Sequence, residues 1–336
     1  MNAPSPDISI LMAAKNVGPY LRDCLDSIIH QTFENWELVV VNDHSDDDTQ
    51  AILDEYAVKD KRIRPFMSEG QRLNPALKTG YKHLLAPLVN RMDADDKMPP
   101  YKLQVMFDAY EGEGTIVAGG TRHFVDNGEV GDGFLRYDQW LNDVAKRGSH
   151  YKEIYRECVF PSHCWLIHRN DLDRIDAFQN DIYPEDYDLA FRFYQLKLKV
   201  IPIDRILHYW RDTENRISRT WDEYKDNRYF DIKLRYFYVI DRDKSRLLAL
   251  WGAGKNGKDL AQLILKRESK FHWVCNNERK IGKDIYGVVL SNEQSINTLN
   301  NPQIVVVVSN PQEREEISVE LRKQGREEGR DYWFFL

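Results

Sequence analysis

The chain concentrates three carboxylates in one short stretch, at Asp93, Asp95 and Asp96, soon after an apolar run. In an extended segment Asp93 and Asp95 point to one side and Asp96 points to the other. Like charges on one side repel unless a cation lies between them, and carboxylate oxygens suit hard ions such as Mg²⁺ or Mn²⁺. A diphosphate could supply the remaining ligands. The alternative is a solvated acidic turn, because charge clusters are common in loops.

A second pair of acids, Glu185 and Asp186, follows Pro184 and precedes apolar residues at helical spacing. We therefore expect a helix to begin near Glu185. Carboxylates in a first turn can simply complement the helix dipole. They can also supply a general base, since an aspartate with its ordinary pKa of about 3.9 is ionised at neutral pH. Both interpretations stay open.

Basic side chains leave a strand-like segment further along the chain. His208, Arg211 and Arg216 could face an anionic diphosphate. Basic residues at such positions are more often simply solvated, so this contact remains one of two interpretations.

The segments that would position these residues alternate between strand and helix patterns. The first four such segments are 8–12, 21–29, 36–41 and 51–58. This alternation predicts a parallel sheet with helices on both faces and ligands beyond the carboxyl ends of its strands. The polar residues that follow these strands should converge on one crevice: Asn16, Asp43 and the cluster at Asp93.

The same alternation continues up to residue 211. The expected strands are 62–66, 115–119, 160–169, 200–203 and 205–211, and the expected helices are 74–85 and 102–110. The stretch 126–149 is different, because it is rich in Gly, Asp and Asn with isolated aromatic residues. We expect it to be a mobile insertion near the crevice.

The end of the chain predicts a second, smaller α/β unit. Its expected strands are 246–251, 271–275 and 304–308, and its expected helices are 258–266 and 313–325. The first strand runs into Gly252, Gly254 and Gly257, which is the context that a dinucleotide fingerprint requires. The next strand ends in Asn276 and Asn277, where an acid would bind a ribose. The glycines could therefore serve only close packing of the helix.

We divide the chain into a domain at 1–220, an aromatic-rich helical linker at 221–244 and a Rossmann-like domain at 245–336. The linker is expected to pack between the domains, because aromatic stripes at helical spacing are usually core. A face for a membrane or a partner is the alternative.

Composition narrows the function. The 336 residues carry a formal net charge of −7, with Lys and Arg scattered among the acids. Nucleic-acid binding needs a concentrated basic surface, so nucleic acid is not expected as a partner. The sequence has no uninterrupted run of eighteen apolar residues and no signal-like start, which predicts a cytoplasmic protein.

Taken together and in order, these motifs resemble those of the inverting nucleotide-sugar glycosyltransferases of family 2. The likeness covers about residues 7–220 and is carried by 8–16, 21–33, 36–43, 93–96, 185–189, 209–211 and Ser218. The resemblance implies a GT-A fold, an α/β fold with a mainly parallel sheet, ahead of the smaller Rossmann-like domain.

The family's metal and base roles carry over to particular residues. The resemblance makes Asp95 the main ligand of Mn²⁺ or Mg²⁺, with Asp93 and Asp96 as further candidates. Asp186 becomes the catalytic base, with Glu185 as the second choice. The base would remove a proton from an acceptor hydroxyl in a single displacement that inverts configuration, while the metal offsets charge on departing UDP.

The resemblance also implies the nucleotide contacts. They are Asp43, which would contact uracil, with Asn16, Lys78, Asp93 and Arg211. Two histidines, His163 and His208, are candidates for contact with the acceptor or the diphosphate. The sequence departs from the family at Asn42, where a second Asp is usual, and at Lys78, where Asn is often found.

The implied partners are a UDP-sugar donor and a glycan or lipid-linked acceptor, as in surface polysaccharide biosynthesis. Peripheral association with the inner face of a membrane and a homo-oligomer are left open. The end of the chain is similar to the nucleotide-binding amino-terminal domains of certain sugar acyltransferases. Two other functions remain alternatives: an NAD-dependent oxidoreductase centred on the glycine turn, and a catalytically inactive sensor of sugar nucleotides.

Overall fold

The structure is a computed structural model that describes residues 5–179, 182–213 and 229–336. These residues form two compact units. The first unit contains the described residues of 5–150 and 159–213, and the second contains 151–158 and 229–336. Segment 151–158 thus groups with the second unit, whereas the division drawn from the sequence placed it in the first domain. The predicted boundary at residue 220 and the start of the linker lie outside the described residues.

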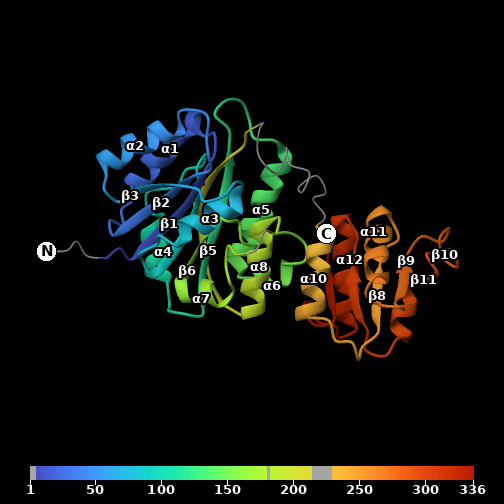
Figure 1. The fold of residues 1–336 in the computed structure, drawn as a ribbon. Helices are drawn as coiled ribbons and strands as arrows, with labels where there is room; N and C mark the ends of the chain where they lie inside the picture. Colours follow the sequence, from blue (N-terminus) through green and yellow to red (C-terminus); the bar gives the residue numbers. More distant parts are fainter. Residues whose placement is uncertain (1–4, 180–181, 214–228) are drawn as a thin grey trace. The chain divides into compact units, whose positions relative to one another are not determined.

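The first unit is built on a mostly parallel sheet with the strand order β3-β2-β1-β4-β6-β5-β7. Within this sheet, strand β6 runs antiparallel to both of its neighbours, β4 and β5. The strands are β1 (Ile8–Ala14), β2 (Trp36–Asn42), β3 (Ile63–Met67), β4 (Leu88–Asp93), β5 (Thr115–Phe124), β6 (Trp165–His168) and β7 (Lys199–Arg211) (Figure 1). Strand β2, between β3 and β1, is buried along its whole length, as expected for a parallel strand covered on both faces.

Helices cover both faces of this sheet, as predicted. They are α1 (Gly18–Ile29), α2 (Thr49–Lys59), α3 (Leu73–Tyr81), α4 (Lys102–Ala109), α5 (Asp132–Arg147), α7 (Arg169–Arg174) and α8 (Glu185–Leu196). The short helix α6 (His150–Glu153) lies mostly in segment 151–158, which groups with the second unit. On one face Leu25 of α1 and Leu53 of α2 share a core with Ile10 of β1. On the other face Gly80 of α3 lies against Leu11 and Val41, whose side chains alternate with the first set.

The stretch predicted to be a mobile insertion is instead largely the helix α5, so that prediction was wrong. The helix is anchored by His123 of β5, whose backbone N–H and ring Nδ1 each lie 2.6 Å from the Asp138 carboxylate. The His123 ring also stacks on Phe134 and on Trp210 of β7. The glycines that suggested a loop lie before the helix or at its ends, where they interrupt nothing.

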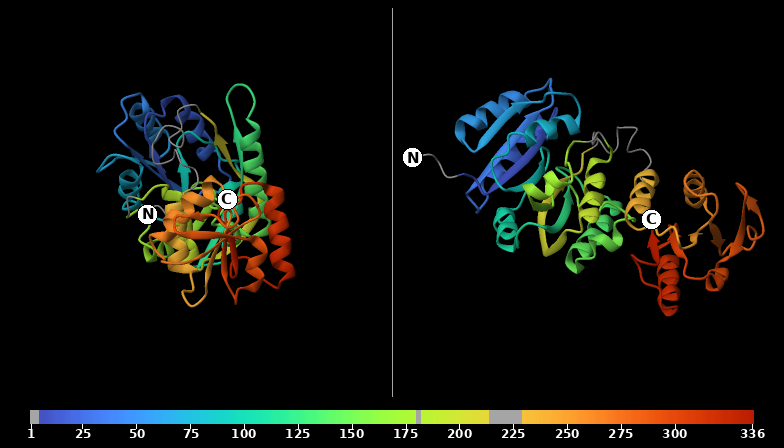
Figure 2. Two further views of the ribbon diagram at one scale, coloured as in Figure 1. Left: turned by 90° about the vertical axis from the view of Figure 1, so that its right-hand side faces the viewer. Right: turned by 60° about the horizontal axis from the view of Figure 1, so that its bottom comes forward.

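The second unit has a sheet of its own with the order β10-β11-β9-β8-β12-β13. Its elements are α10 (Phe230–Ile240), β8 (Leu248–Trp251), α11 (Lys255–Leu265), β9 (His272–Cys275), β10 (Asp284–Ile285), β11 (Val288–Asn292), the 3₁₀ helix η2 (Glu293–Thr298), β12 (Gln303–Val306), α12 (Pro311–Lys323) and β13 (Tyr332–Phe334). Figure 2 shows helices on both sides of it. Strand β10 is antiparallel to β11, and the remaining neighbours are parallel.

The aromatic residues at the start of this unit belong to its core. Phe237 of α10 contacts the rings of Trp333 and Phe335 at 5.1 and 5.9 Å between centroids. Tyr155, from the short segment that joins this unit, stacks on Phe335 at 5.1 Å and donates a hydrogen bond of 2.6 Å to Asp241. The described part of the predicted linker is therefore a core helix of the second unit.

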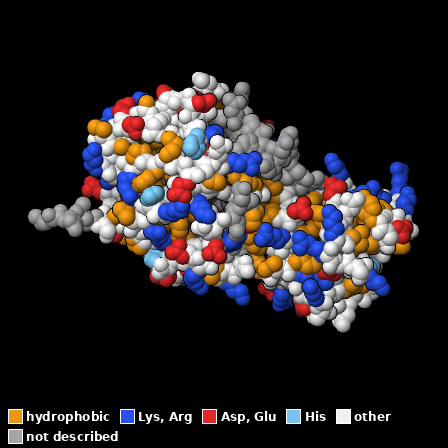
Figure 3. All heavy atoms as spheres, viewed as in Figure 1, with side chains coloured by type: hydrophobic (Ala, Val, Ile, Leu, Met, Phe, Trp, Pro, Cys, Tyr) orange, Lys and Arg blue, Asp and Glu red, His pale blue; other side chains and the backbone are white. Residues whose placement is uncertain are grey.

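The surface carries mixed charge. On the face drawn in Figure 3, Lys and Arg side chains are interspersed with Asp and Glu and do not form a continuous basic stripe. Among the described residues no helix is both long enough and apolar enough to cross a bilayer.

Candidate active site

The carboxyl ends of β1, β2 and β4, where the sequence predicts a crevice, lie side by side in the sheet. Strand register brings these ends together, because Ala14 pairs with Asn42 of β2 while Ala13 pairs with Asp93 of β4. The residues that follow parallel strands therefore share one edge of the sheet, the place where such folds bind ligands. The acids of the β2 loop and of β4 meet here as the sequence predicted.

Asp43 is buried and has one unsatisfied oxygen. Its Oδ2 accepts the backbone N–H of Arg72 at 3.0 Å and lies 3.7 Å from Lys15 Nζ. Its Oδ1 has no hydrogen-bond partner among the described residues. Leaving a buried acceptor unpaired costs roughly 1–3 kcal/mol, so this oxygen is suited to receive a donor from a ligand.

Asn16 and Lys78 lie in different surroundings from Asp43. Asn16 is exposed, and its side-chain oxygen accepts the N–H of Asp46 at 3.0 Å, which orders the loop after β2. Lys78 is exposed in the last turn of α3, and its charge acts on Glu69. Residues 214–228, which include Arg216 and Ser218, lie outside the described residues.

Asp93 and Asp95 form the accessible part of the acidic cluster. The side chain of Asp93 is 29% exposed, with Oδ1 3.5 Å from Arg91 Nη2 and Oδ2 3.3 Å from Ser162 Oγ. Burial opposes its ionisation, but Arg91, His163 and Ser162 outweigh burial and hold the pKa of Asp93 well below its ordinary value. Asp95 is partly exposed in the turn that follows β4. Ionised oxygens at the rim of a crevice fit Mg²⁺ or Mn²⁺.

Asp96 does not share this position, and its prediction as a metal ligand is corrected. The chain turns after Asp93, so Asp96 points into the protein and is fully buried. Its Oδ2 lies 2.8 Å from His208 Nε2, and its Oδ1 accepts the backbone N–H of Arg211 at 2.7 Å. Asp96, His163 and His208 lie close enough to hold an ion. The ammonium of Lys102, 3.5 Å from His208 Nδ1, makes that interior cluster unsuitable for a cation.

The two candidate histidines form a buried pair below the acids. Their rings stack with centroids 3.6 Å apart, and both residues are fully buried. Burial lowers the pKa of His163 to about 4 and holds the pKa of His208 well below its ordinary value, so both are neutral. His208 therefore supports Asp96 and does not reach a diphosphate or an acceptor, contrary to the prediction. His163 is equally buried, with Nδ1 3.5 Å from Asp93, and supports that carboxylate instead.

Arg211 was predicted to contact a diphosphate, but in the structure it supports the turn that carries Asp95. Its side chain is 1% exposed. Nε donates to the backbone oxygen of Asp95 at 2.7 Å, Nη2 donates to Asp23 at 3.2 Å, and Nη1 pairs with Asp126. These bonds occupy the donors that would have met a phosphate, and they fix the backbone of the turn that presents Asp95.

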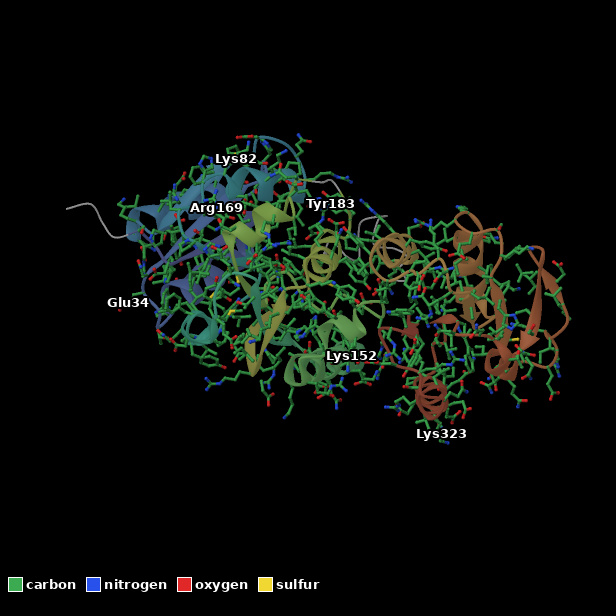
Figure 4. All side chains as sticks on the ribbon, turned by 90° about the horizontal axis from the view of Figure 1, so that it is seen from below. Glu34, Lys82, Lys152, Arg169, Tyr183 and Lys323 are labelled. Atoms are coloured by element: carbon green, nitrogen blue, oxygen red, sulfur yellow. The ribbon has the colours of Figure 1, made fainter. Side chains whose placement is uncertain are left out.

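Glu185 and Asp186 begin α8 as predicted, directly after Pro184 and close to Tyr183, which is labelled in Figure 4. Glu185 Oε1 lies 2.9 Å from Arg91 Nη2, and Asp186 Oδ1 accepts the N–H of Tyr187 at 2.8 Å. Burial, and after it the charge of Glu185, raises the pKa of Asp186 well above its ordinary value. Asp186 is thus a stronger base than the ordinary aspartate that the sequence suggested.

Sequence reasoning missed three residues of this site: Arg91, Lys102 and Ser162. Arg91 had a readable signal, since it is a cation inside a short strand-like run between the apolar pair Leu88 and Val89 and Met92. Lys102 is fully buried and donates to the backbone oxygen of His163 at 2.7 Å. Ser162 gave no signal, because its contact with Asp93 joins positions far apart in the chain.

The second unit has a crevice at the same edge of its sheet. A cavity of about 280 Å³ is lined by the glycine turn after β8, by Lys255 and Lys280, and by Asn276. A Cβ on Gly257 would lie 2.1 Å from the backbone oxygen of Gly252, whereas one on Gly254 would meet no atom within 4 Å. Gly257 is thus required for close packing of α11, as the sequence suggested for this turn.

Comparison with known proteins gives relatives of the first unit. The glycosyltransferase GlyA of Streptococcus pneumoniae serotype 4 is 29% identical over 222 residues, which cover 64% of this chain and 32% of GlyA. EpsH of Bacillus subtilis is 28% identical over 170 residues, which cover 47% of this chain and 49% of EpsH. The chain therefore spans about a third to a half of the length of these curated relatives.

Solved structures share the fold. S. aureus TarS in complex with UDP-GlcNAc superposes with a TM-score of 0.53 at 15% identity, over 79% of this chain and 73% of TarS. The mannosyltransferase PcManGT from Pyrobaculum calidifontis, in complex with GDP-Man and Mn²⁺, gives 0.52 at 17% identity, over 71% of this chain and 65% of that chain. At such low identity these likenesses establish the fold, which is GT-A.

Residues 9–176 match the family described as glycosyl transferase family 2, a range that includes β1, β2 and β4 with Asp43, Asp93 and Asp95 and ends before α8. The second unit is not part of this match, apart from segment 151–158. Since the matched range spans half of the 336 residues, the chain belongs to glycosyl transferase family 2.

Proposed function

We propose that the chain transfers a sugar from a UDP-sugar to an acceptor hydroxyl by a single displacement that inverts the anomeric configuration. One observation carries the proposal. A carboxylate with a raised pKa, Asp186, begins α8, and Glu185 beside it is joined through Arg91 to Asp93 at the carboxyl edge of the sheet. A base on the acceptor side and ionised oxygens on the donor side are the two groups that this displacement needs.

The choice of uridine rests on Asp43. Its Oδ2 already accepts an N–H from the protein, which leaves Oδ1 as the oxygen for a ligand. Uracil offers one imide N–H between two carbonyls, whereas guanine offers adjacent N–H groups that would need both oxygens. One unpaired buried acceptor therefore matches uracil better than guanine.

The reaction follows from the position of Asp186. Its carboxylate removes the proton of the acceptor hydroxyl as the hydroxyl oxygen bonds to the anomeric carbon. The bond between that carbon and the diphosphate oxygen breaks at the same time, and UDP leaves with its electron pair. Attack from the side opposite the leaving group inverts the configuration. The raised pKa of Asp186 increases its affinity for the proton that it receives.

A divalent cation, Mn²⁺ or Mg²⁺, would be held by Asp95 and Asp93. When bound, it would offset the negative charge that grows on the departing diphosphate. The chain's own residues prepare this place: Arg211 fixes the backbone of Asp95, and Ser162 and His163 hold Asp93 in its ionised form.

The sugar and the acceptor are proposed by class only. We propose a hexosyl or N-acetylhexosaminyl donor and a glycan or lipid-linked acceptor, as in the assembly of a surface polysaccharide. Among the fold neighbours, TarS has been solved with UDP-GlcNAc, which makes that sugar nucleotide a suitable first donor to test.

The test measures UDP release by the purified chain with a panel of UDP-sugars and acceptors in the presence of Mn²⁺. We expect release to stop in chelator and in Asp95→Ala, and to persist in Asp46→Ala, which changes an exposed acid of the neighbouring loop. UDP should also stabilise the protein against heat more than GDP does at equal concentration. Equal release by the Asp95→Ala variant and the unmodified chain would contradict the metal assignment.

A further inference from the structure

Arg91 is a buried cation under the acids of the site. It lies on β4 two residues before Asp93, so the two side chains leave the same face of the strand. Its side chain is 3% exposed, and one nitrogen, Nη2, reaches two carboxylates: Glu185 Oε1 at 2.9 Å and Asp93 Oδ1 at 3.5 Å. One guanidinium thus joins the strand on the donor side to the helix on the acceptor side.

This arginine is not explained by the stability of the strand. Its Nε and Nη1 are buried and have no hydrogen-bond partner in the part of the chain that the structure describes. Each unpaired buried donor costs roughly 1–3 kcal/mol, and an apolar residue at this position of β4 would avoid that cost. Of its neighbours along the strand, Met92 is a fully buried apolar residue, and Asn90 is buried and donates to the backbone oxygen of Trp165 at 2.6 Å.

The arginine treats two adjacent carboxyls differently. Glu185 is paired with it at 2.9 Å and also lines a small pocket with Asn74 and Arg192. Among the described residues Asp186 forms no ion pair with the guanidinium, and its Oδ1 accepts the N–H of the next residue in the helix. The two acids are neighbours in sequence, but only one has a cation at contact distance within the described residues.

We propose that Arg91 is a positioning residue that assigns the roles of the two acids: it holds Glu185 as a fixed anion and leaves Asp186 as the base. The inference rests on the proposed function and deepens it. Without Arg91, either carboxyl could turn into the crevice and take the proton. With it, the proton acceptor is one defined side chain at the start of a rigid helix.

The same arrangement sets the strength of the base. The charged groups that act on Asp186 are Glu185 on its own helix and Arg91 and Asp93 on β4. Glu185 and Asp93 favour the protonated form of Asp186, and Arg91 favours the ionised form. Without Arg91, burial and the two anions would raise the pKa of Asp186 even more.

The test compares the pH dependence of kcat in matched variants. Arg91→Gln removes the cation, so the midpoint of the increase of kcat with pH should shift to higher pH by roughly one pH unit or more. Glu185→Gln removes the neighbouring anion, so this midpoint should shift to lower pH. The double variant removes both charges and should return toward the unmodified profile. Arg91→Lys keeps the charge and should move the profile least.

The thermal stability of the same variants provides a control for folding. Arg91→Gln leaves Glu185 buried without its cation and should lower Tm, whereas the double variant should recover part of that loss. A reduced kcat in Arg91→Gln with an unmoved pH midpoint would mean that Arg91 is only structural, and would overturn the inference. Loss of transfer in Glu185→Gln with transfer retained in Asp186→Asn would also overturn it, while the transferase function stood.

A measurement without turnover separates this inference from the proposed function. The ¹³C carboxyl signal of Asp186 in aspartate-labelled protein, assigned by its absence in Asp186→Asn, reports the titration directly. An upward move in Arg91→Gln and a downward move in Glu185→Gln support the role of Arg91 even if no sugar nucleotide is turned over. Identical titration in all variants would refute it.

Discussion

At the carboxyl edge of the first sheet, charged side chains are buried and some polar atoms are left unpaired. At the same edge of the second sheet, polar groups bond to one another. Lys280 Nζ donates to the backbone oxygen of Ala253 at 2.7 Å, and Asn276 donates to Glu313 at 2.7 Å. At the edge of the first sheet, one oxygen of Asp43 and two nitrogens of Arg91 have no hydrogen-bond partner in the described part of the chain.

This difference indicates which of the two α/β units carries the reactive site. Parallel strands deliver their following residues to one edge in both units, so the fold supplies a place. Buried groups with unmet hydrogen bonds and shifted pKa values are costly, and they are enriched at functional sites. We therefore expect the edge of the first sheet to be the reactive one.

The largest effect is expected for the base. Asp186→Asn should reduce transfer by about 10²–10⁴-fold, the usual contribution of a general base, with donor binding retained. The matched change in the second crevice is Glu313→Gln, which removes a lining carboxylate and should leave transfer unchanged. UDP release measured for both variants tests whether the first unit alone is reactive, and an equal loss of release in both would contradict this.

A smaller effect is expected at the nucleotide base. In Asp43→Asn the amide oxygen must face the N–H of Arg72, so the amide NH₂ would face the N–H of uracil. Two donors facing each other should raise the KM for the UDP-sugar by about 10–100-fold, which corresponds to roughly 1–3 kcal/mol. Asp46→Asn, on the exposed part of the same loop, should leave KM unchanged. A KM that is insensitive to Asp43→Asn would remove uracil from this position.

The pH dependence tests the electrostatics of the first crevice. A base must be ionised, and burial with Glu185 raises the pKa of Asp186. Transfer should therefore increase with pH through that raised pKa, well above the ordinary value of about 3.9, and should fall about tenfold for each pH unit below it. The profile of kcat, collected where thermal unfolding shows an intact fold, checks this. A midpoint near the ordinary value would exclude the raised pKa.

The smallest effect on activity is expected from the glycine turn of the second unit. Gly257→Ala places a Cβ against the backbone oxygen of Gly252 and should destabilise this unit by about 1–3 kcal/mol. Gly254→Ala meets no neighbouring atom and should change the free energy of unfolding far less. Denaturant unfolding distinguishes them, and UDP release should remain in both. Equal stability of the two variants would mean that close packing does not explain the turn.

The sequence predicted the sheet and the positions of Asp43, Asp93, Asp95 and Asp186, because each acid follows an apolar run or begins a helix. Such signals are local. The inward position of Asp96 depends on His208 and Arg211, more than a hundred residues away, and on a turn that ends the extended strand. An extended strand was therefore the wrong basis for dividing the roles of Asp95 and Asp96.

Other errors had the same origin. Glycine and aspartate suggested a loop at 126–149, but the pairing of His123 with Asp138 and the stacking on Trp210 hold a helix there. Arg211 and His208 have the residue types of phosphate ligands, yet burial and carboxylate partners give them supporting roles. Residue type alone does not reveal which partner will satisfy a charge.

Segment 151–158 has a practical consequence for dissecting the protein. A fragment beginning at residue 229 would lack Tyr155, whose ring covers Phe335 and whose hydroxyl bonds to Asp241. It would also lack the backbone oxygen of Arg156, which accepts a hydrogen bond of 2.8 Å from the buried Lys233. Cloning the second unit by simple truncation would expose an aromatic surface and would leave Lys233 with its bond to the backbone oxygen of Phe335 but without the one to Arg156. A stable fragment therefore needs residues 151–158 grafted back through an engineered connection.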